Sequence, residues 1–215
     1  MDYQKLFNEE IDKASIAAWR SSGKKALGIV CCHVPQEILH AAEILPLRLR
    51  ATGCEDYSEA EVWMSSFSCS FAKSILQYLI DNVYDLDGLV TSDGCMQAVR
   101  IYDNWKAASK EAGKEQHVYE IGAPRMNSST AKQYYKAELN ILKEEMEKLS
   151  GNTVTDEKLM KSIEVYNEQR RLVKELLALQ KADKPVVTGT DVCKILLAAT
   201  TMPVEEYNEL LKAFL

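Results

Sequence analysis

The sequence predicts an α/β fold with a parallel sheet, and two observations lead to this prediction. Four short apolar runs alternate with segments of helical periodicity over residues 24–122, and strands separated by helices pair in parallel through right-handed crossovers. Beyond residue 125 the pattern changes to long helices of mixed charge. We therefore expect a Rossmann-like or flavodoxin-like sheet of about four strands, with helices on both faces, in residues 1–125. A helical carboxy-terminal extension, residues 126–215, should pack on it.

Each expected strand is a short apolar run bounded by turn-forming residues. The expected strands are 26–30, 45–49, 88–91 and 117–121. Gly23 and Pro35 bound the first, and Gly122 closes the last, as is typical of buried strands. No G-x-G-x-x-G sequence follows the first strand, so the dinucleotide-binding fingerprint is missing.

Helices are expected where apolar residues recur at helical spacing. The expected helices span 3–21, 35–43, 71–83, 97–112, 130–149, 155–182, 190–199 and 203–215, and residues 52–58 should form a loop. Pro35 and Pro203 suit a first turn, whereas Thr155 and Thr190 suit a cap.

Composition excludes several classes of protein. The 215 residues are 47% hydrophobic and 27% charged, which is typical of globular domains. The net charge of -6 argues against a nucleic-acid surface, which needs a basic patch. No window approaches the roughly 20 apolar residues of a membrane span, and the first residues lack the apolar core of a secretory signal. We expect a cytoplasmic protein that contacts neither nucleic acid nor membrane.

Six cysteines require an explanation in such a protein, because a reducing cytosol keeps thiols free for metal binding or chemistry. They are Cys31, Cys32, Cys54, Cys69, Cys95 and Cys193. None forms a C-x-x-C pair, so their spacing by itself does not identify a metal.

Four of these cysteines fall where ligands gather in open α/β sheets, beyond the carboxyl ends of the strands. Cys31 and Cys32 follow the first strand, Cys95 follows the third, and Cys69 precedes a helix whose amino terminus would stabilise a thiolate. Three converging thiolates would suit one cubane cluster. The alternative is that they are buried as small apolar residues.

The histidines and the remaining cysteines are expected either at the carboxyl edge of the sheet or in the core. Because Cys31 and Cys32 are adjacent, we expect only one of them to point into the site. His33 would line the pocket or act as an acid or base, or else form structural hydrogen bonds. His40 is expected to be structural, and Cys54 and Cys193 are expected to be buried.

Four segments of the sequence carry a resemblance to a known family. Residues 34–48 resemble its "Val-Pro-Glu-Glu" turn and "Leu-Pro-Val-Arg" strand, 68–73 its "Cys-x-Phe-Ala-Arg" element, 95–103 its "Cys-Asp-x-x-x-Arg-x-Tyr-Asp" element, and 188–211 the region before its second domain. The family that these segments resemble is that of the 2-hydroxyacyl-CoA dehydratases and benzoyl-CoA reductases. The likeness extends over nearly the whole chain in the right order, and it is that of the amino-terminal half of a D-component-like subunit.

The resemblance implies a [4Fe-4S] cluster with Cys69 and Cys95 as ligands, and Cys32 or, less favoured, Cys31 as the third. His33 and Glu37 are the candidate catalytic residues. It also implies a homologous subunit as partner in a homo- or heterodimer, an ATP-dependent iron–sulfur activator, and a CoA-thioester substrate. In this family a low-potential electron converts the thioester carbonyl to a ketyl radical, which acidifies the β-hydrogen.

Two departures from the family qualify these expectations. The second Rossmann-like domain is missing from the sequence, and Met96 stands where the family has Asp. Catalysis by this chain alone is therefore not expected. The alternatives to a dehydratase component are a non-catalytic iron–sulfur or interaction module, a double-cubane-type reductase component, and a plain ligand-binding domain.

Overall fold

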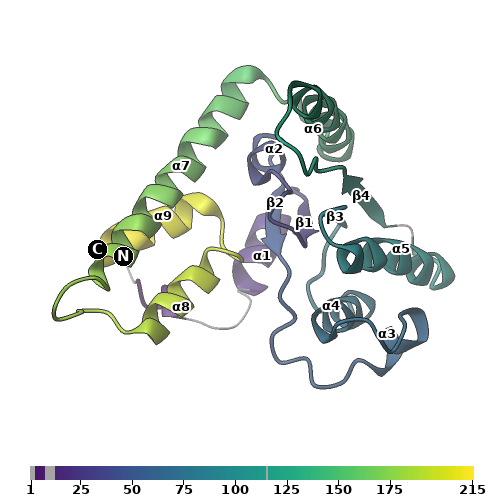
Figure 1. The fold of residues 1–215 in the computed structure, drawn as a ribbon, viewed down its shortest axis with the longest axis horizontal. Coiled ribbons are helices and arrows are strands. Elements are labelled where there is room, and N and C mark those ends of the chain that lie inside the picture. The colour runs from purple at the N-terminus through teal and green to yellow at the C-terminus, as the bar shows by residue number, and fades with distance from the viewer. Residues whose placement is uncertain (1–2, 8–12, 115) are drawn as a thin grey trace.

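The computed structural model describes residues 3–7, 13–114 and 116–215 (Figure 1). Its strands are β1 (Ala26–Ile29), β2 (Leu45–Arg48), β3 (Gly88–Ser92) and β4 (His117–Ile121). They form a parallel sheet in the order β2-β1-β3-β4. The predicted α/β sheet is confirmed, and of the two alternatives the strand order is the flavodoxin-like one.

Helices precede and separate these strands. They are η1, a 3-10 helix (Tyr3–Phe7), α1 (Lys13–Ser21), α2 (Gln36–Ala41), α3 (Ser58–Trp63), α4 (Ser70–Ile80) and α5 (Met96–Glu111), followed after β4 by α6 (Ser129–Ser150), α7 (Asp156–Leu179), α8 (Gly189–Ala198) and α9 (Val204–Phe214).

The sheet has an apolar core on each face, because successive strand residues point to opposite sides. On one face Leu45, Leu47 and Leu89 pack with α1, α3, α4 and α5. On the other, Leu27 and Ile29 pack with α2 and α6. The predicted placement of helices on both faces is therefore confirmed.

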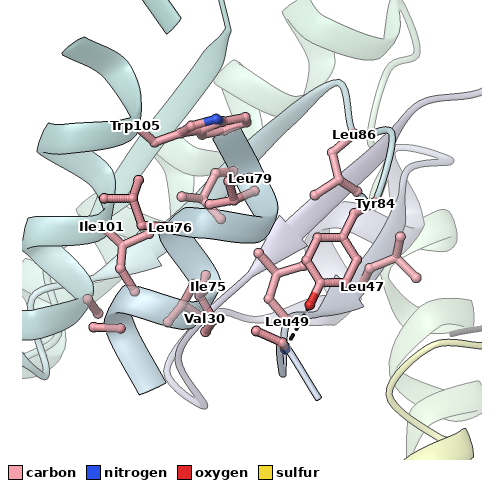
Figure 2. Close-up of a cluster of buried hydrophobic side chains, with 14 of the residues drawn as sticks. Val30, Leu47, Leu49, Ile75, Leu76, Leu79, Tyr84, Leu86, Ile101 and Trp105 are labelled. Carbon is pink, nitrogen blue, oxygen red and sulfur yellow. Dashed lines mark hydrogen bonds between the residues drawn. The ribbon is translucent and has the colours of Figure 1, made fainter. Parts of the chain in front are cut away.

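Figure 2 shows how the first of these cores ends beside β2. Ile101 and Trp105 of α5 pack with Leu76 and Leu79 of α4. Tyr84 lies near Leu49, and its hydroxyl accepts a hydrogen bond from the N–H of Ala51 at 2.7 Å. This contact fixes the segment that follows β2.

The carboxy-terminal helices form a third apolar cluster. Tyr207, Leu210 and Leu211 of α9 pack with α8, the end of α7 and Leu6 of η1. The long helix α7 runs from α6 at the sheet to this cluster, where η1 and α9 lie side by side (Figure 1). The N–H of Arg48 donates to the carbonyl of Thr200 at 2.9 Å, so the α8–α9 connection covers the edge of β2.

Two sequence-based expectations need correction, and one helix was not predicted. The expected loop is confirmed for residues 52–57, but residues 58–63 form α3, in which only Ala60 is buried. Thr188, not Thr190, caps α8, through a capping box with Asp191. The expected helix over 3–21 begins as the 3-10 turn η1, and its residues 8–12 lie outside the described part. In that part no helix is long and apolar enough to cross a membrane.

Candidate functional site

The carboxyl edge of the sheet has its switch in strand order between β1 and β3. The chain leaves β1 toward β2 on one side, whereas β3 lies on the other side. In open α/β sheets ligands bind at this point, because the loops diverge there and leave a crevice. The two loops at this switch carry Cys31, Cys32, His33 and Cys95.

The loop after β1 brings three potential metal ligands together. The Sγ atom of Cys31 lies 3.5 Å from Nδ1 of His33. One ligand atom from each of Cys31, Cys32 and His33 lies within 4.8 Å of the others. The two adjacent thiols therefore lie on the same side of the loop as the His33 ring, and which of them points into the predicted cluster site stays a prediction. Among the described residues, no other group of at least three His, Cys, Asp or Glu side chains is as close.

The loops after β1 and β3 pack tightly against each other at Gly94. A Cβ atom added at Gly94 would lie 2.5 Å from Nδ1 of His33. The Gly94 N–H also donates to the buried Ser92 hydroxyl at 3.3 Å. From α6, the Tyr135 hydroxyl donates to the His33 carbonyl at 3.1 Å. Glycine is therefore required for the approach of the two loops.

The thiol of Cys31 has a pKa below its ordinary value. Burial, the largest cause, raises the pKa. Hydrogen bonds with Ser92, the His33 backbone and Cys32, together with the positive charge of Arg48, outweigh it. The thiolate, which is the form that binds metals, is thereby favoured.

Cys69 and Cys95 occupy equivalent positions at the starts of two neighbouring helices. Each is the N-cap residue, Cys69 of α4 and Cys95 of α5, and each is exposed with extended backbone angles. The two helices pack against each other. Unpaired backbone N–H groups and the helix dipole stabilise negative charge at such positions. Both exposed cysteines therefore begin helices at positions where a bound negative group would be stabilised.

A hollow beside these two cysteines was not predicted from the sequence. It has a volume of about 400 Å³ and lies between the 63–68 segment and the first turns of α5. Its lining includes Phe67, which is 97% exposed, and Gln97, whose Oε1 atom is buried without a hydrogen-bond partner in the described structure. Met96 is also exposed. In the sequence, the only indication of this hollow is Phe67, an aromatic residue between serines.

The other residues singled out in the sequence either lie away from the carboxyl edge of the sheet or are bonded to other side chains. Glu37 pairs with Arg170 of α7. His40 is bonded through both ring nitrogens, as a structural residue would be, to Ser162 at 2.7 Å and to Glu205 at 2.9 Å. Cys193 is exposed, so its predicted burial is wrong. Cys54 is half-buried against the α4 and α5 core.

The cysteine set is chemically suited to an iron–sulfur cluster. All six cysteines are free thiols, and those at the carboxyl edge lie in loops or at helix starts, where they are accessible to a metal cluster. A cubane distributes its thiolates over different iron atoms, so Cys69 and Cys95 need not be as close to Cys32 as the three residues of the β1 loop are to one another.

Comparison with known proteins gives a consistent result. The family described as "2-hydroxyglutaryl-CoA dehydratase, D-component" matches residues 31–215. A benzoyl-CoA reductase subunit from Thauera aromatica is 30% identical over 211 residues, which cover 96% of this chain and 54% of that protein. The beta subunit of (R)-2-hydroxyglutaryl-CoA dehydratase from Acidaminococcus fermentans is 27% identical over 202 residues, 93% of this chain and 52% of that protein.

A third relative has a similar relationship to the chain. The beta subunit of (R)-phenyllactyl-CoA dehydratase from Clostridium sporogenes is 26% identical over 190 residues, 87% of this chain and 50% of that protein. The chain thus spans about half the length of these relatives. The family match includes the β1 loop and both N-cap cysteines, and the chain belongs to the 2-hydroxyglutaryl-CoA dehydratase D-component family.

Proposed function

We propose that this chain is the iron–sulfur-binding part of a 2-hydroxyacyl-CoA dehydratase-like or benzoyl-CoA reductase-like enzyme that acts on a CoA thioester. The observation that carries the proposal is the distribution of cysteines. Cys31, Cys32 and Cys95 lie in the two loops at the switch in strand order, and Cys69 begins the helix packed beside the one that Cys95 begins. The relatives named above are subunits of enzymes for CoA thioesters.

In this proposal Cys69, Cys95 and Cys32 hold a [4Fe-4S] cluster. The bound cluster would supply a low-potential electron to the substrate. The helix starts at Cys69 and Cys95 stabilise their thiolates, and Gly94 allows the β1 loop to lie against the β3 loop. Exposed apolar side chains such as Phe67 would exclude water from the hollow.

We assign proton transfer at this site to His33 rather than to Glu37. The His33 imidazole is exposed and lies at the β1 loop, with Nδ1 near the Cys31 thiol. Glu37 is paired with Arg170, so its carboxylate is engaged in joining α2 to α7. Glu37 would then position the β1 loop from the start of α2.

The proposed activity requires components beyond this chain. The relatives are named as subunits, which supports a homologous subunit as partner. We include an ATP-dependent activator in the proposal, because a low-potential electron has to be delivered to the site. Free thiols as cluster ligands also fit a reducing cytoplasm.

Anaerobic purification tests the cofactor directly. We expect about four irons and matching sulfide per chain, with absorbance near ~400 nm. Cys69→Ser and Cys95→Ser should each lose most of the iron. Cys193→Ser is the matched control, because it alters an exposed cysteine on α8 and should leave the iron content unchanged.

Two results would contradict the proposal. Full iron content in both Cys69→Ser and Cys95→Ser would remove the ligand assignment. If the iron-loaded chain, supplied with a partner subunit, activator and ATP, neither dehydrates 2-hydroxyacyl-CoA thioesters nor reduces benzoyl-CoA, the enzymatic role is wrong and a non-catalytic module is favoured.

A further inference from the structure

Two arginines continue from β2 at the same edge of the sheet as the cysteine loop. Arg48 ends the strand and is paired in register with Ile29, after which the β1 chain continues to Cys31. Arg50 follows two residues later, and the N–H of Leu49 still donates to the carbonyl of Ile29 at 3.0 Å. Alternation therefore places both arginines on the face of the sheet that carries Ile29.

Neither arginine has a carboxylate partner in the described part of the chain. The positive charge of Arg48 acts on the thiol of Cys31. Arg20, Arg100 and Arg170, in contrast, each pair with an aspartate or glutamate. The two charges beside β2 are therefore left available to a ligand.

Arg50 carries the stronger signal. Its Nε and Nη1 atoms are buried and have no hydrogen-bond partner among the described residues. Burial lowers the pKa of Arg50 below its ordinary value. The charges of Tyr84 and of Cys193 on α8 would raise it, but burial is the larger effect. Burying part of a guanidinium without a counter-charge is costly, and such a group is usually paired with an anion.

The surroundings hold Arg50 in place. The Tyr84 hydroxyl accepts from the N–H of the next residue, Ala51 (Figure 2). The N–H of Arg48 donates to the carbonyl of Thr200. The backbone on both sides is thereby anchored. The guanidinium that it carries presents a planar fork of N–H donors, which suits the paired oxygens of a carboxylate or phosphate.

We infer that Arg48 and Arg50 form an anion-binding site that takes an oxyanion group of the thioester substrate beside the cysteine loop. The inference rests on the proposed function and deepens it. The shared chemistry is a phosphate or carboxylate oxygen pair, which can come from the phosphates of the CoA moiety or from a carboxylate at the far end of the acyl group.

Calorimetric titration of the anaerobically purified chain distinguishes the two sources. CoA is compared with pantetheine and with adenosine, its two phosphate-free parts, and glutaryl-pantetheine is compared with butyryl-pantetheine, which lacks the carboxylate. Binding of CoA but of neither phosphate-free part identifies the phosphates. Binding of glutaryl-pantetheine but not of butyryl-pantetheine identifies the acyl carboxylate.

Substitutions then connect binding to the arginines. Arg50→Gln and Arg48→Gln should each weaken binding of the anionic probe about ten-fold to a hundred-fold, as expected for charge-assisted hydrogen bonds. Arg50→Lys should restore only part of the affinity, because a lysine lacks the planar fork. Arg171→Gln removes the same charge from an exposed position on α7 and should change nothing.

The inference is overturned if no anionic probe binds the wild-type chain, or if Arg50→Gln and Arg171→Gln have equal effects. Its failure is separable from that of the proposed function. The iron content of the arginine variants should equal that of the wild type, and probe binding can be measured on iron-free protein. If the cysteine variants keep their iron, the cofactor assignment fails but probe binding by the arginines still stands. If the arginine variants bind the probe normally, the anion site fails but the cofactor assignment still stands.

Discussion

His33 and His40 lie on either side of α2 in the chain, and their surroundings differ completely. The His33 ring is exposed at the carboxyl edge, with the Cys31 thiol as its neighbour. The His40 ring is mostly buried between α2, α7 and α9, bonded to Ser162 and Glu205 and packed edge-on against Tyr166. Because an ionised Glu205 can only accept, Nε2 of His40 donates to it, and the Ser162 hydroxyl, which can donate or accept, is bonded to Nδ1.

The difference separates stability from function in this molecule. At the His40 junction the polar groups satisfy one another, as expected where helices are held together. At the carboxyl edge the thiols, a histidine and two arginines have no partner of opposite charge among the residues that the structure describes. Unsatisfied groups lower stability and are retained where a ligand completes them. Four predictions test this comparison.

The largest effect is expected at the junction. His40→Ala removes two hydrogen bonds and leaves the Ser162 hydroxyl, on a residue only 2% exposed, without its acceptor. We expect the free energy of unfolding to fall by about 2–4 kcal/mol. Urea denaturation measures it. His33→Ala is the matched control and should cost less than about 1 kcal/mol; equal losses would break the comparison.

The next effect is expected where the two edge loops meet. Gly94→Ala puts a methyl group against the His33 ring, so the β1 loop has to shift. The expected cost is about 1–3 kcal/mol, with reduced iron binding in the same protein. Gly113→Ala lies away from the edge with free space around it and tests backbone strain alone. Full iron binding in Gly94→Ala would mean that the packing of the loops is not needed for the site.

A gain of stability is expected at Arg50. Arg50→Met replaces a partly buried, unpartnered guanidinium by an apolar side chain of similar length. We expect the free energy of unfolding without ligand to rise by about 1 kcal/mol. Denaturation with and without the anionic probe should show the gain only in its absence. A loss of stability in both conditions would indicate that the guanidinium is structural.

The smallest effect is a pH dependence at the junction. The hydrogen bond from His40 holds the pKa of Glu205 below its ordinary value of 4.5, although burial opposes it. A depressed pKa in the folded state stabilises the fold above the ordinary pKa, and the contribution is lost as the pH falls through the folded value. Because Glu205 is half exposed, the contribution should be below about 1 kcal/mol. The stability difference between wild type and Glu205→Gln should shrink from roughly pH 5 to pH 3; a constant difference contradicts the prediction.

The sheet could be predicted because its signals are local. Each strand is an apolar run closed by glycine or proline, and Gly88 even permits the approach of β4, since a Cβ atom there would lie 2.1 Å from the His117 carbonyl oxygen. The α3 segment could not be predicted, because Ala60 is its only buried residue and it therefore lacks apolar periodicity.

The site was predictable only in part. Strand order determines which loops meet, and the sequence placed Cys31, Cys32 and Cys95 in those loops correctly. It could not show that the sulfur atoms of Cys31 and Cys32 share one group with His33. Nor could it show that Nε and Nη1 of Arg50 lack a hydrogen-bond partner among the described residues, or that Cys193 is exposed, because both depend on how the carboxy-terminal helices pack.

The most direct test of the account is one parallel measurement of iron per chain in Cys95→Ser and in His40→Gln, both purified without oxygen. We expect Cys95→Ser to retain less than about half of the wild-type iron at unchanged stability. His40→Gln should keep its iron while losing stability. Full iron in Cys95→Ser, or equal iron loss in both variants, would contradict the claim that the carboxyl edge serves the cofactor and the His40 junction serves the fold.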